Sequence, residues 1–241
     1  MSADLRVTLD ARPAPVGLRP GRTAVVVVDM QNDFGSVGGM FERADIDISS
    51  IEKIVEPIAR VLAVARAAGM PVIYLKMAFS PDLADAGFPD SPTWIKHMPM
   101  RAGEEVMAPD GSASRILIRD TWNTDIVEAL APRASDIVVH KTRYSGFYNT
   151  DLEATMRTRD VETIIFVGAT TSVCVESTVR DAMFRDFHCI VLSDCTAEPI
   201  GADTARSNHE ASLLVLQLLF ASISDSDALL AALAGATPTS R

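Results

Sequence analysis

Three residue types that can together perform nucleophilic catalysis stand at the ends of three separate apolar runs. Asp29 follows TAVVVV, Lys141 follows IVVH, and Cys174 comes shortly after the run TIIFV and Gly168. Short β-branched runs without a helical period are typical of strands buried on both faces of a parallel sheet. The carboxyl ends of such strands share one edge of the sheet, where ligands bind. We therefore expect a carboxylate, an ammonium group and a thiol to face one another.

Cys174 stands where a strand is expected to give way to a helix. The apolar residues Val175, Val179, Ala182 and Met183 recur at spacings of three and four, as in a helix packed on a sheet. A thiol at a helix start lies near unpaired backbone N–H groups and the positive end of the helix dipole, which favour the thiolate and can hold an oxyanion. The alternative is a small buried core residue, since free cysteine is among the most buried residue types.

Asp29 and Lys141 have structural interpretations as well. An aspartate after a strand is often a turn or cap residue, and a lysine there is usually solvated. The coincidence of an acid, a cation and a thiol at three strand ends favours a shared catalytic site over three unrelated structural roles.

The sequence blocks around these residues resemble those of the isochorismatase-like cysteine hydrolase superfamily. The resemblance is carried by VVVVDMQNDF, HKTRYSGFYNTDLE and GATTSVCVESTVRD, and it extends from about residue 24 to about residue 224. It implies that Asp29, Lys141 and Cys174 form the catalytic triad. It also implies a cis peptide bond before Thr170, which would turn the N–H groups of Thr170 and Cys174 toward one oxyanion hole.

The same resemblance implies hydrolysis of a C–N bond in a small ureido or carbamoyl compound, through a carbamoyl thioester on Cys174. The last two blocks favour ureidoacrylate or its peracid as the substrate. The alternatives are a neutral linear ureide such as triuret or biuret, or an N-carbamoyl amino acid, because fold and triad do not choose the substrate. A carboxylate needs an arginine or lysine at the far end of the pocket, whereas a neutral ureide needs amide donors and acceptors. A non-catalytic binding protein would leave the triad unexplained.

The pocket walls are expected to come from the segments that follow these strands. The long segment from Met77 to about Arg119, rich in proline, glycine and aspartate, is expected to be a wall or lid, with an oligomer contact as the alternative. The candidate substrate-binding residues are Phe34, Phe79, Arg143, Tyr144, Phe147 and Asn149. Their aromatic members have plain core packing as the competing interpretation. Candidate cations for an anionic substrate are Lys141, Arg143, Arg115, Arg119 and His97.

The sequence predicts no metal and no other cofactor. Nicotinamidases of this superfamily bind a metal through an Asp-x-His arrangement after the second strand, where this chain has Phe79, Ser80 and Pro81. No histidine pair at ligand spacing occurs elsewhere in the sequence.

Apolar runs alternate with segments of helical period, which predicts a doubly wound α/β fold. We expect a six-stranded, mostly parallel sheet with helices on both faces. Helices are expected near residues 50–68, 123–130, 174–183, 202–219 and 226–233. Residues 1–21 are proline-rich and without a period, so we expect an irregular arm that can pack on a neighbouring subunit. Residues 22–235 are expected to form a single hydrolase domain, followed by a disordered tail.

Composition narrows the class of protein further. The formal net charge is −10 in 241 residues, which argues against nucleic acid or an anionic membrane as a partner. No apolar run approaches the roughly 20 residues of a membrane span, and acidic residues and prolines occupy the N-terminal segment. Three cysteines are too few for a disulfide framework. We expect a cytoplasmic enzyme of a small molecule, and the resemblance implies a homodimer or homotetramer.

Overall fold

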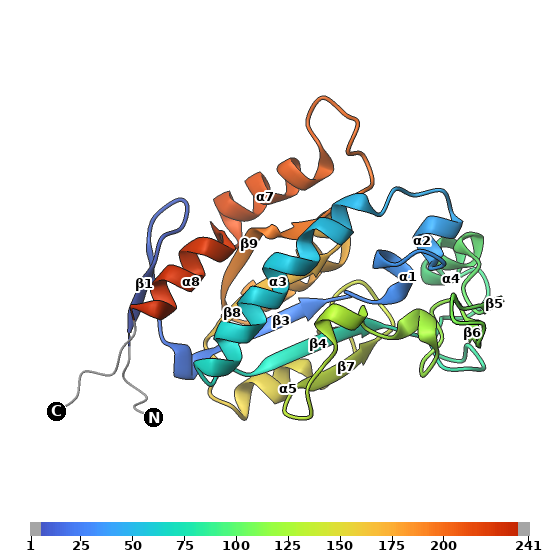
Figure 1. Cartoon of the computed structure of the whole chain (residues 1–241), viewed down its shortest axis with the longest axis horizontal. Helices are drawn as coiled ribbons and strands as arrows, with labels where there is room; N and C mark the ends of the chain where they lie inside the picture. The colour runs from blue at the N-terminus through green and yellow to red at the C-terminus, as the bar shows by residue number, and fades with distance from the viewer. Residues whose placement is uncertain (1–5, 236–241) are drawn as a thin grey trace.

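A six-stranded sheet forms the centre of the molecule in the computed structural model, which describes residues 6–235 (Figure 1). Its strands lie in the order β10-β9-β8-β3-β4-β7, and every neighbouring pair is parallel. The strands are β3 (Thr23–Val28), β4 (Val72–Met77), β7 (Ile137–Lys141), β8 (Thr163–Ala169), β9 (His188–Ala197) and β10 (Ser222–Ser224). The predicted doubly wound α/β fold is confirmed, and the sheet is parallel throughout.

Helices cover both faces of this sheet and create two hydrophobic cores. On one face lie α3 (Ser49–Ala67) and α8 (Ser226–Ala234), and on the other lie α5 (Leu152–Arg157), α6 (Glu176–Met183) and α7 (Asn208–Leu219). Strand β3 serves both cores, because successive side chains of a strand point to opposite faces. Val25 and Val27 pack with α3, whereas Val26 and Val28 pack with α6. This double burial explains why the run contains no charged residue.

The chain changes its direction of travel across the sheet between β3 and β8. From β3 it winds through β4 to β7 at one edge, whereas β8, β9 and β10 lead to the other edge. A crevice forms at the carboxyl ends of the strands at such a switch point, and ligands bind in it. Asp29 follows β3, and Cys174 follows β8. The strand order therefore places both residues at this crevice.

The N-terminal segment is more regular than the arm expected for residues 1–21. Within its described part, β1 (Val7–Leu9) and β2 (Val16–Leu18) form a two-stranded antiparallel sheet, and Arg12 pairs with Ile223 of β10. Leu9 and Leu18 are fully buried in the core of the same chain. The expectation of an irregular arm is wrong there: Pro13 and Pro15 lie in the connection between the strands, and Pro20 begins the 3₁₀ turn after β2. Residues 1–5 and the tail 236–241 lie outside the described residues.

The segment between β4 and β7 also contains regular structure that was expected to be loop. It holds α4 (Pro92–His97), the 3₁₀ turn η2 (Met98–Met100), and the antiparallel strands β5 (Glu105–Met107) and β6 (Ala113–Arg115). The helix expected at 123–130 is instead two 3₁₀ turns, η3 (Trp122–Thr124) and η4 (Glu128–Leu130).

Two short helices, α1 (Asn32–Gly35) and α2 (Met40–Arg43), follow β3 and lie beside this segment (Figure 1). The helix expected from residue 202 begins only at Asn208, where Ser207 and Glu210 form a capping box.

Helix α3 continues through Pro57 without a break.

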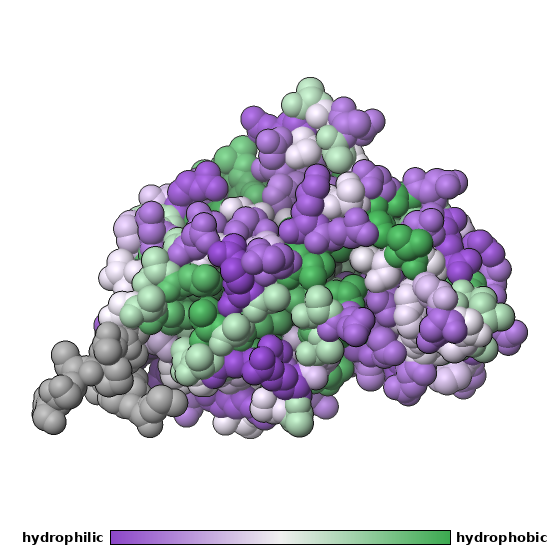
Figure 2. Space-filling model, viewed as in Figure 1, coloured by the Kyte–Doolittle hydropathy of each residue, from purple (hydrophilic) through white to green (hydrophobic). Residues whose placement is uncertain are grey.

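The surface is mixed in character. The face that carries α3 shows hydrophilic side chains with hydrophobic patches between them (Figure 2). Exposed apolar side chains gather on α6 and α7 at Met183, Leu214, Val215, Leu218 and Leu219. Across residues 6–235, no helix combines the length and the apolar character that crossing a bilayer requires.

Candidate active site

The three side chains predicted to form the site converge at the crevice. Lys141 Nζ lies 2.7 Å from Asp29 Oδ2 and 3.4 Å from Cys174 Sγ. All three residues are buried. Lys141 belongs to β7, with β4 between it and β3, so its ammonium must reach across a strand. A long lysine stem can span that distance, and Nζ passes 3.9 Å from Met77 Sδ on β4.

The carboxylate of Asp29 is held at both of its oxygens. Asp29 has φ +48°, a left-handed conformation in which aspartate is enriched among non-glycine residues. The backbone N–H of Met77 donates to Oδ1 over 3.0 Å. Oδ2 lies 2.7 Å from the ammonium of Lys141, which is its charged partner. A buried carboxyl group in contact with a cation and next to the thiol is suited to exchange a proton with the thiol or with a substrate.

Cys174 lies in a single turn of π-helix, η5 (Thr171–Val175), which continues into α6. The peptide bond between Ala169 and Thr170 is cis, as the resemblance implied. Gly168 is required before this turn because its φ is +115° and a Cβ there would lie 2.1 Å from the carbonyl oxygen of Val28. The end of β8 can therefore approach β3 closely, which brings the thiol turn toward Asp29.

Burial controls the protonation of the site. It raises the pKa of the Cys174 thiol well above its usual range, and the charge of Lys141 counteracts only part of this effect. Burial therefore opposes the thiolate that a helix start favours. Burial likewise raises the pKa of Asp29. Burial opposes the charge on Lys141, but the neighbouring Asp29 and Cys174 outweigh it and raise the pKa of the lysine.

A cavity of about 120 Å³ opens beside the thiol. Its walls are formed by Asp29, Phe34, Met40, Phe41, Met77, His97, Met100, Leu117, Tyr144, Ala169, Thr170, Val173, Cys174 and Ile200. Phe34 and Tyr144, predicted to bind substrate, lie in these walls, as does Thr170, predicted for the oxyanion hole. Most of the remaining wall residues are apolar. The volume of the cavity suits a small molecule.

Four other predicted substrate-binding residues are absent from these walls. Phe79 is fully buried behind His97, with ring centroids 5.6 Å apart. Arg143 directs its guanidinium to the carbonyl oxygens of Asp85 and Thr142. Phe147 packs on Phe187 in the core near α6, which is the competing interpretation given above. Asn149 is exposed, with φ +49°.

Arg119 and Arg115, two of the cations proposed for an anionic substrate, bind other groups of the protein. Arg119 forms an ion pair with Asp85, and Arg115 donates to the carbonyl oxygens of Gly103 and Pro81. His97 does line the cavity, but burial lowers its pKa, so it is neutral at pH 7. The expectation of a cationic His97 is therefore wrong.

Asp33 is a site residue that the sequence reasoning missed. Its buried carboxylate accepts hydrogen bonds from the N–H of Met40 at 3.1 Å, the N–H of Leu117 at 2.7 Å and the side-chain amide of Asn123 at 2.6 Å. Met40 and Leu117 line the cavity, so Asp33 joins two of its walls. Burial raises the pKa of Asp33 to about 7. A polar run directly after a buried strand was the available signal.

Glu198 was missed as well. Its buried carboxylate accepts from both the N–H and the hydroxyl of Ser172, and from the N–H of Ile200 at 3.1 Å. Ser172 belongs to the turn that carries Cys174, and Ile200 lines the cavity. Glu198 therefore connects the nucleophile turn to a wall. Nothing in the local sequence pattern indicates this role.

Potential metal ligands do not gather in the described part of the chain. No group of three histidine, cysteine, aspartate or glutamate side chains that could hold an ion is found in residues 6–235. The absence of a metal requirement stays a prediction.

Fold and site together define a class: a doubly wound α/β protein with cysteine, aspartate and lysine at the switch point of its sheet. The family model described as isochorismatase domain matches residues 23–228. The chain belongs to the isochorismatase family.

Several relatives carry the name ureidoacrylate amidohydrolase RutB. The protein from Methylobacterium radiotolerans is 41% identical over 219 residues, which cover 91% of this chain and 82% of that protein. The one from Caulobacter segnis is 44% identical over 193 residues, covering 79% and 78%.

Solved structures agree with this assignment. A cysteine hydrolase from Pseudomonas syringae pv. phaseolicola has a TM-score of 0.76 at 34% identity, covering 91% of this chain and 96% of that one. N-carbamoylsarcosine amidase from Thermoplasma acidophilum has a TM-score of 0.62 at 25% identity, covering 86% and 97%.

Proposed function

We propose that this hydrolase cleaves a C–N bond of a small ureido or carbamoyl compound with Cys174 as the nucleophile. The observation that supports this proposal most directly is that the ammonium group of Lys141 contacts both the carboxylate of Asp29 and the sulfur of Cys174. The relatives named ureidoacrylate amidohydrolase support an amidohydrolase and make ureidoacrylate or its peracid the first candidate substrate.

In the proposed first half-reaction, Asp29 removes the proton of Cys174 as the sulfur attacks the carbonyl carbon. The high pKa of the buried thiol makes this proton transfer necessary, and burial makes Asp29 a stronger base than an exposed aspartate. Lys141 stabilises the developing thiolate. The N–H groups of Thr170 and Cys174 hold the oxyanion, and the proton on Asp29 passes to the departing nitrogen.

In the proposed second half-reaction, Asp29 activates a water molecule against the carbamoyl thioester. The water oxygen bonds to the carbonyl carbon, the C–S bond breaks, and Cys174 regains a proton. The product is a carbamate, which decomposes to ammonia and carbon dioxide.

A second candidate substrate class is a neutral linear ureide such as biuret or triuret. One observation favours it: no arginine or lysine is among the residues that line the cavity. The remote carboxylate of ureidoacrylate would have no cation to neutralise it there. Burying an unpaired charge in an apolar cavity is costly.

The test is ammonia release from a panel of ureides by the wild type and by Cys174→Ser. We expect the variant to bind substrate but to lose turnover by at least about a thousandfold, because a serine in this site is a far weaker nucleophile. Cys189→Ala is the matched control, since Cys189 is a buried thiol whose sulfur contacts only backbone carbonyls of Val179 and Phe187. Undiminished hydrolysis by Cys174→Ser would reject the nucleophile assignment.

The cytoplasmic location and the homodimer or homotetramer stay predictions. The exposed apolar side chains on α6 and α7 support an oligomer, because monomers rarely expose such a patch.

A further inference from the structure

The hydroxyl group of Thr178 joins the two segments that carry the thiol and the ammonium group of the site. Thr178 lies on α6, one turn after Cys174, and is fully buried. Its Oγ1 donates to the carbonyl oxygen of Cys174 over 2.6 Å and accepts from the backbone N–H of Gly146 over 3.0 Å. Gly146 belongs to the loop of residues 142–149, which follows Lys141. One hydroxyl group therefore connects the turn of the nucleophile to the loop of the lysine.

The second of these bonds distinguishes Thr178 from an ordinary helical threonine. A threonine in a helix often donates to the carbonyl oxygen four residues earlier. Thr158, which follows α5, does so to Ala154 over 2.9 Å at the exposed end of that helix. The hydroxyl of Thr178 additionally accepts the buried N–H of Gly146 from another element. A buried N–H needs an acceptor, so the loop is held where Thr178 places it.

Gly146 lets the loop approach the sheet closely enough for this bond. A Cβ at this position would lie 2.4 Å from Cδ1 of Leu75 and 3.1 Å from Cδ2 of Leu152, and both leucines are fully buried. The carbonyl oxygen of Gly146 accepts from the hydroxyl of Thr150. Both backbone polar groups of Gly146 are thus occupied, which fixes the middle of the loop.

The same loop contacts the ammonium group of Lys141. Nζ donates to the carbonyl oxygen of Arg143 over 3.2 Å, in addition to its contacts with Asp29 and with Cys174 Sγ. Tyr144, the next residue of the loop, lines the cavity. The position of the loop therefore determines one partner of the ammonium group and one wall of the cavity.

Together these contacts form a closed ring. It passes from Cys174 Sγ to Lys141 Nζ and to the carbonyl of Arg143, along the loop to Gly146, and through the Thr178 hydroxyl back to Cys174. The ammonium group and the thiol come from β7 and from the turn after β8, and β3 and β4 lie between these strands. The ring connects the two groups directly, without passing through those strands.

We propose that Thr178 is a positioning residue, whose hydroxyl group keeps the ammonium group of Lys141 in contact with the sulfur of Cys174. It acts through the loop 142–149 and does not touch the substrate. This inference rests on the proposed hydrolase function and adds a residue to the machinery of the same site.

The first test measures kcat for a ureide that the wild type hydrolyses. Thr178→Val keeps the branched shape but can neither donate nor accept a hydrogen bond, so we expect kcat to fall at least about tenfold. Thr178→Ser retains the hydroxyl and should stay within about threefold of the wild type. Thr158→Val is the matched control, because it removes only a bond within one helix, and its kcat should stay within about twofold. If the valine variant does not fold, Thr178→Ala and Thr178→Ser, which differ by the hydroxyl alone, give the same comparison.

The second test follows the contact between Lys141 and Cys174, through alkylation of Cys174 by iodoacetamide at about pH 8, read by mass spectrometry. The thiolate is the reacting form, and a nearby ammonium group stabilises it, so Thr178→Val should slow alkylation at least about fivefold. In the Asp29→Asn/Lys141→Met background, which lacks both buried charges, the same substitution should change the rate by less than about twofold, because Thr178 acts through Lys141.

Alkylation needs no substrate, so it separates this inference from the proposed function. If the wild type hydrolyses no ureide, the proposed function fails, and slower alkylation of Thr178→Val still supports the role of Thr178. Unchanged or faster alkylation of Thr178→Val, or a slowing that persists without Lys141, overturns the role of Thr178 and leaves the hydrolase function standing.

Discussion

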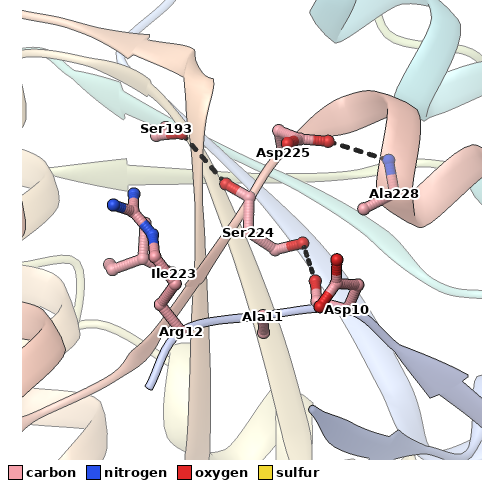
Figure 3. Close-up of a pocket in the computed structure, with 8 residues that line it drawn as sticks. All are labelled: Asp10, Ala11, Arg12, Ser193, Ile223, Ser224, Asp225 and Ala228. Atoms are coloured by element: carbon pink, nitrogen blue, oxygen red, sulfur yellow. Dashed lines mark hydrogen bonds between the residues drawn. The ribbon is translucent and has the colours of Figure 1, made fainter. Parts of the chain in front are cut away.

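Two cavities within residues 6–235 differ in character. The larger, of about 240 Å³, lies where the N-terminal segment meets β10 (Figure 3). Its polar groups satisfy one another: Ser193 donates to the carbonyl oxygen of Ser224, and the Ser224 hydroxyl donates to that of Asp10. The smaller cavity, of about 120 Å³, is lined by Asp29 and Cys174, and behind it Asp29 forms a buried ion pair with Lys141.

In this comparison, buried charged groups distinguish the cavity proposed for catalysis, whereas the volume of the cavity does not. Burying Asp29 and Lys141 costs several kcal/mol per ion, and their contact offsets only part of that cost. Such an arrangement persists at functional sites, where perturbed pKa values serve proton transfer. The residues around Ser224 lack that feature, so we expect them to act on stability alone.

The largest expected effect is the loss of Lys141. Lys141→Met leaves Asp29 buried without its cation, which should destabilise the fold by about 3 to 5 kcal/mol and abolish turnover. Urea unfolding and kcat/KM are the measurements. Adding Asp29→Asn should recover stability but not activity. If Lys141→Met alone were as stable as the wild type, the ion pair would not be what distinguishes the smaller cavity.

The free energy of unfolding should depend on pH through Asp33, by an amount similar to the loss expected for Lys141→Met. Its carboxyl has a pKa of about 7 in the folded chain against 3.8 normally, so the folded state binds more protons between these values. The protonated carboxyl group of Asp33 therefore makes its full contribution to the free energy of unfolding below about pH 4. This contribution decreases as the pH rises from about 4 to about 7, by up to about 4 kcal/mol in all. Asp33→Asn should flatten that slope in unfolding measurements. An unchanged slope would contradict the raised pKa.

An intermediate effect is expected for Glu198. Glu198→Gln cannot accept from both Ser172 groups and Ile200, so the turn of Cys174 should lose its alignment. We expect kcat to fall at least about tenfold, equivalent to about 1.4 kcal/mol. Glu210→Gln is the control, because Glu210 is exposed and caps α7 without touching the site. If kcat were the same for Glu198→Gln and Glu210→Gln, Glu198 would not be needed to position the turn that carries Cys174.

The smallest effect tests the larger cavity. Ser224→Ala removes the hydrogen bond to the carbonyl oxygen of Asp10, which should cost about 1 kcal/mol of stability. The kcat/KM should stay within about twofold of the wild type. A large loss of turnover in Ser224→Ala would mean that the two cavities are coupled. It would contradict the expectation that the residues around Ser224 affect stability alone.

Local sequence patterns were sufficient for the sheet and for the three reactive residues. A strand buried on both faces must be an uninterrupted apolar run, so the first charged or nucleophilic residue after each run stands at the crevice. Asp29 and Lys141 were found by this rule, and Cys174 was found by its place at the start of the helix that follows the next apolar run. The N-terminal segment was expected to be irregular because β1 and β2, which pair with each other, are only three residues long and too short to show an alternating pattern.

Loop side chains and protonation states could not be inferred in the same way. Phe147 and Tyr144 are near neighbours in one loop, yet one packs in the core and the other lines the cavity. Their directions depend on partners from other elements. The pKa of the Cys174 thiol is raised because several segments together exclude water from it. Short-range pattern thus determined which residues reach the crevice, and long-range packing determined their orientation and charge, since desolvation sums over the whole fold.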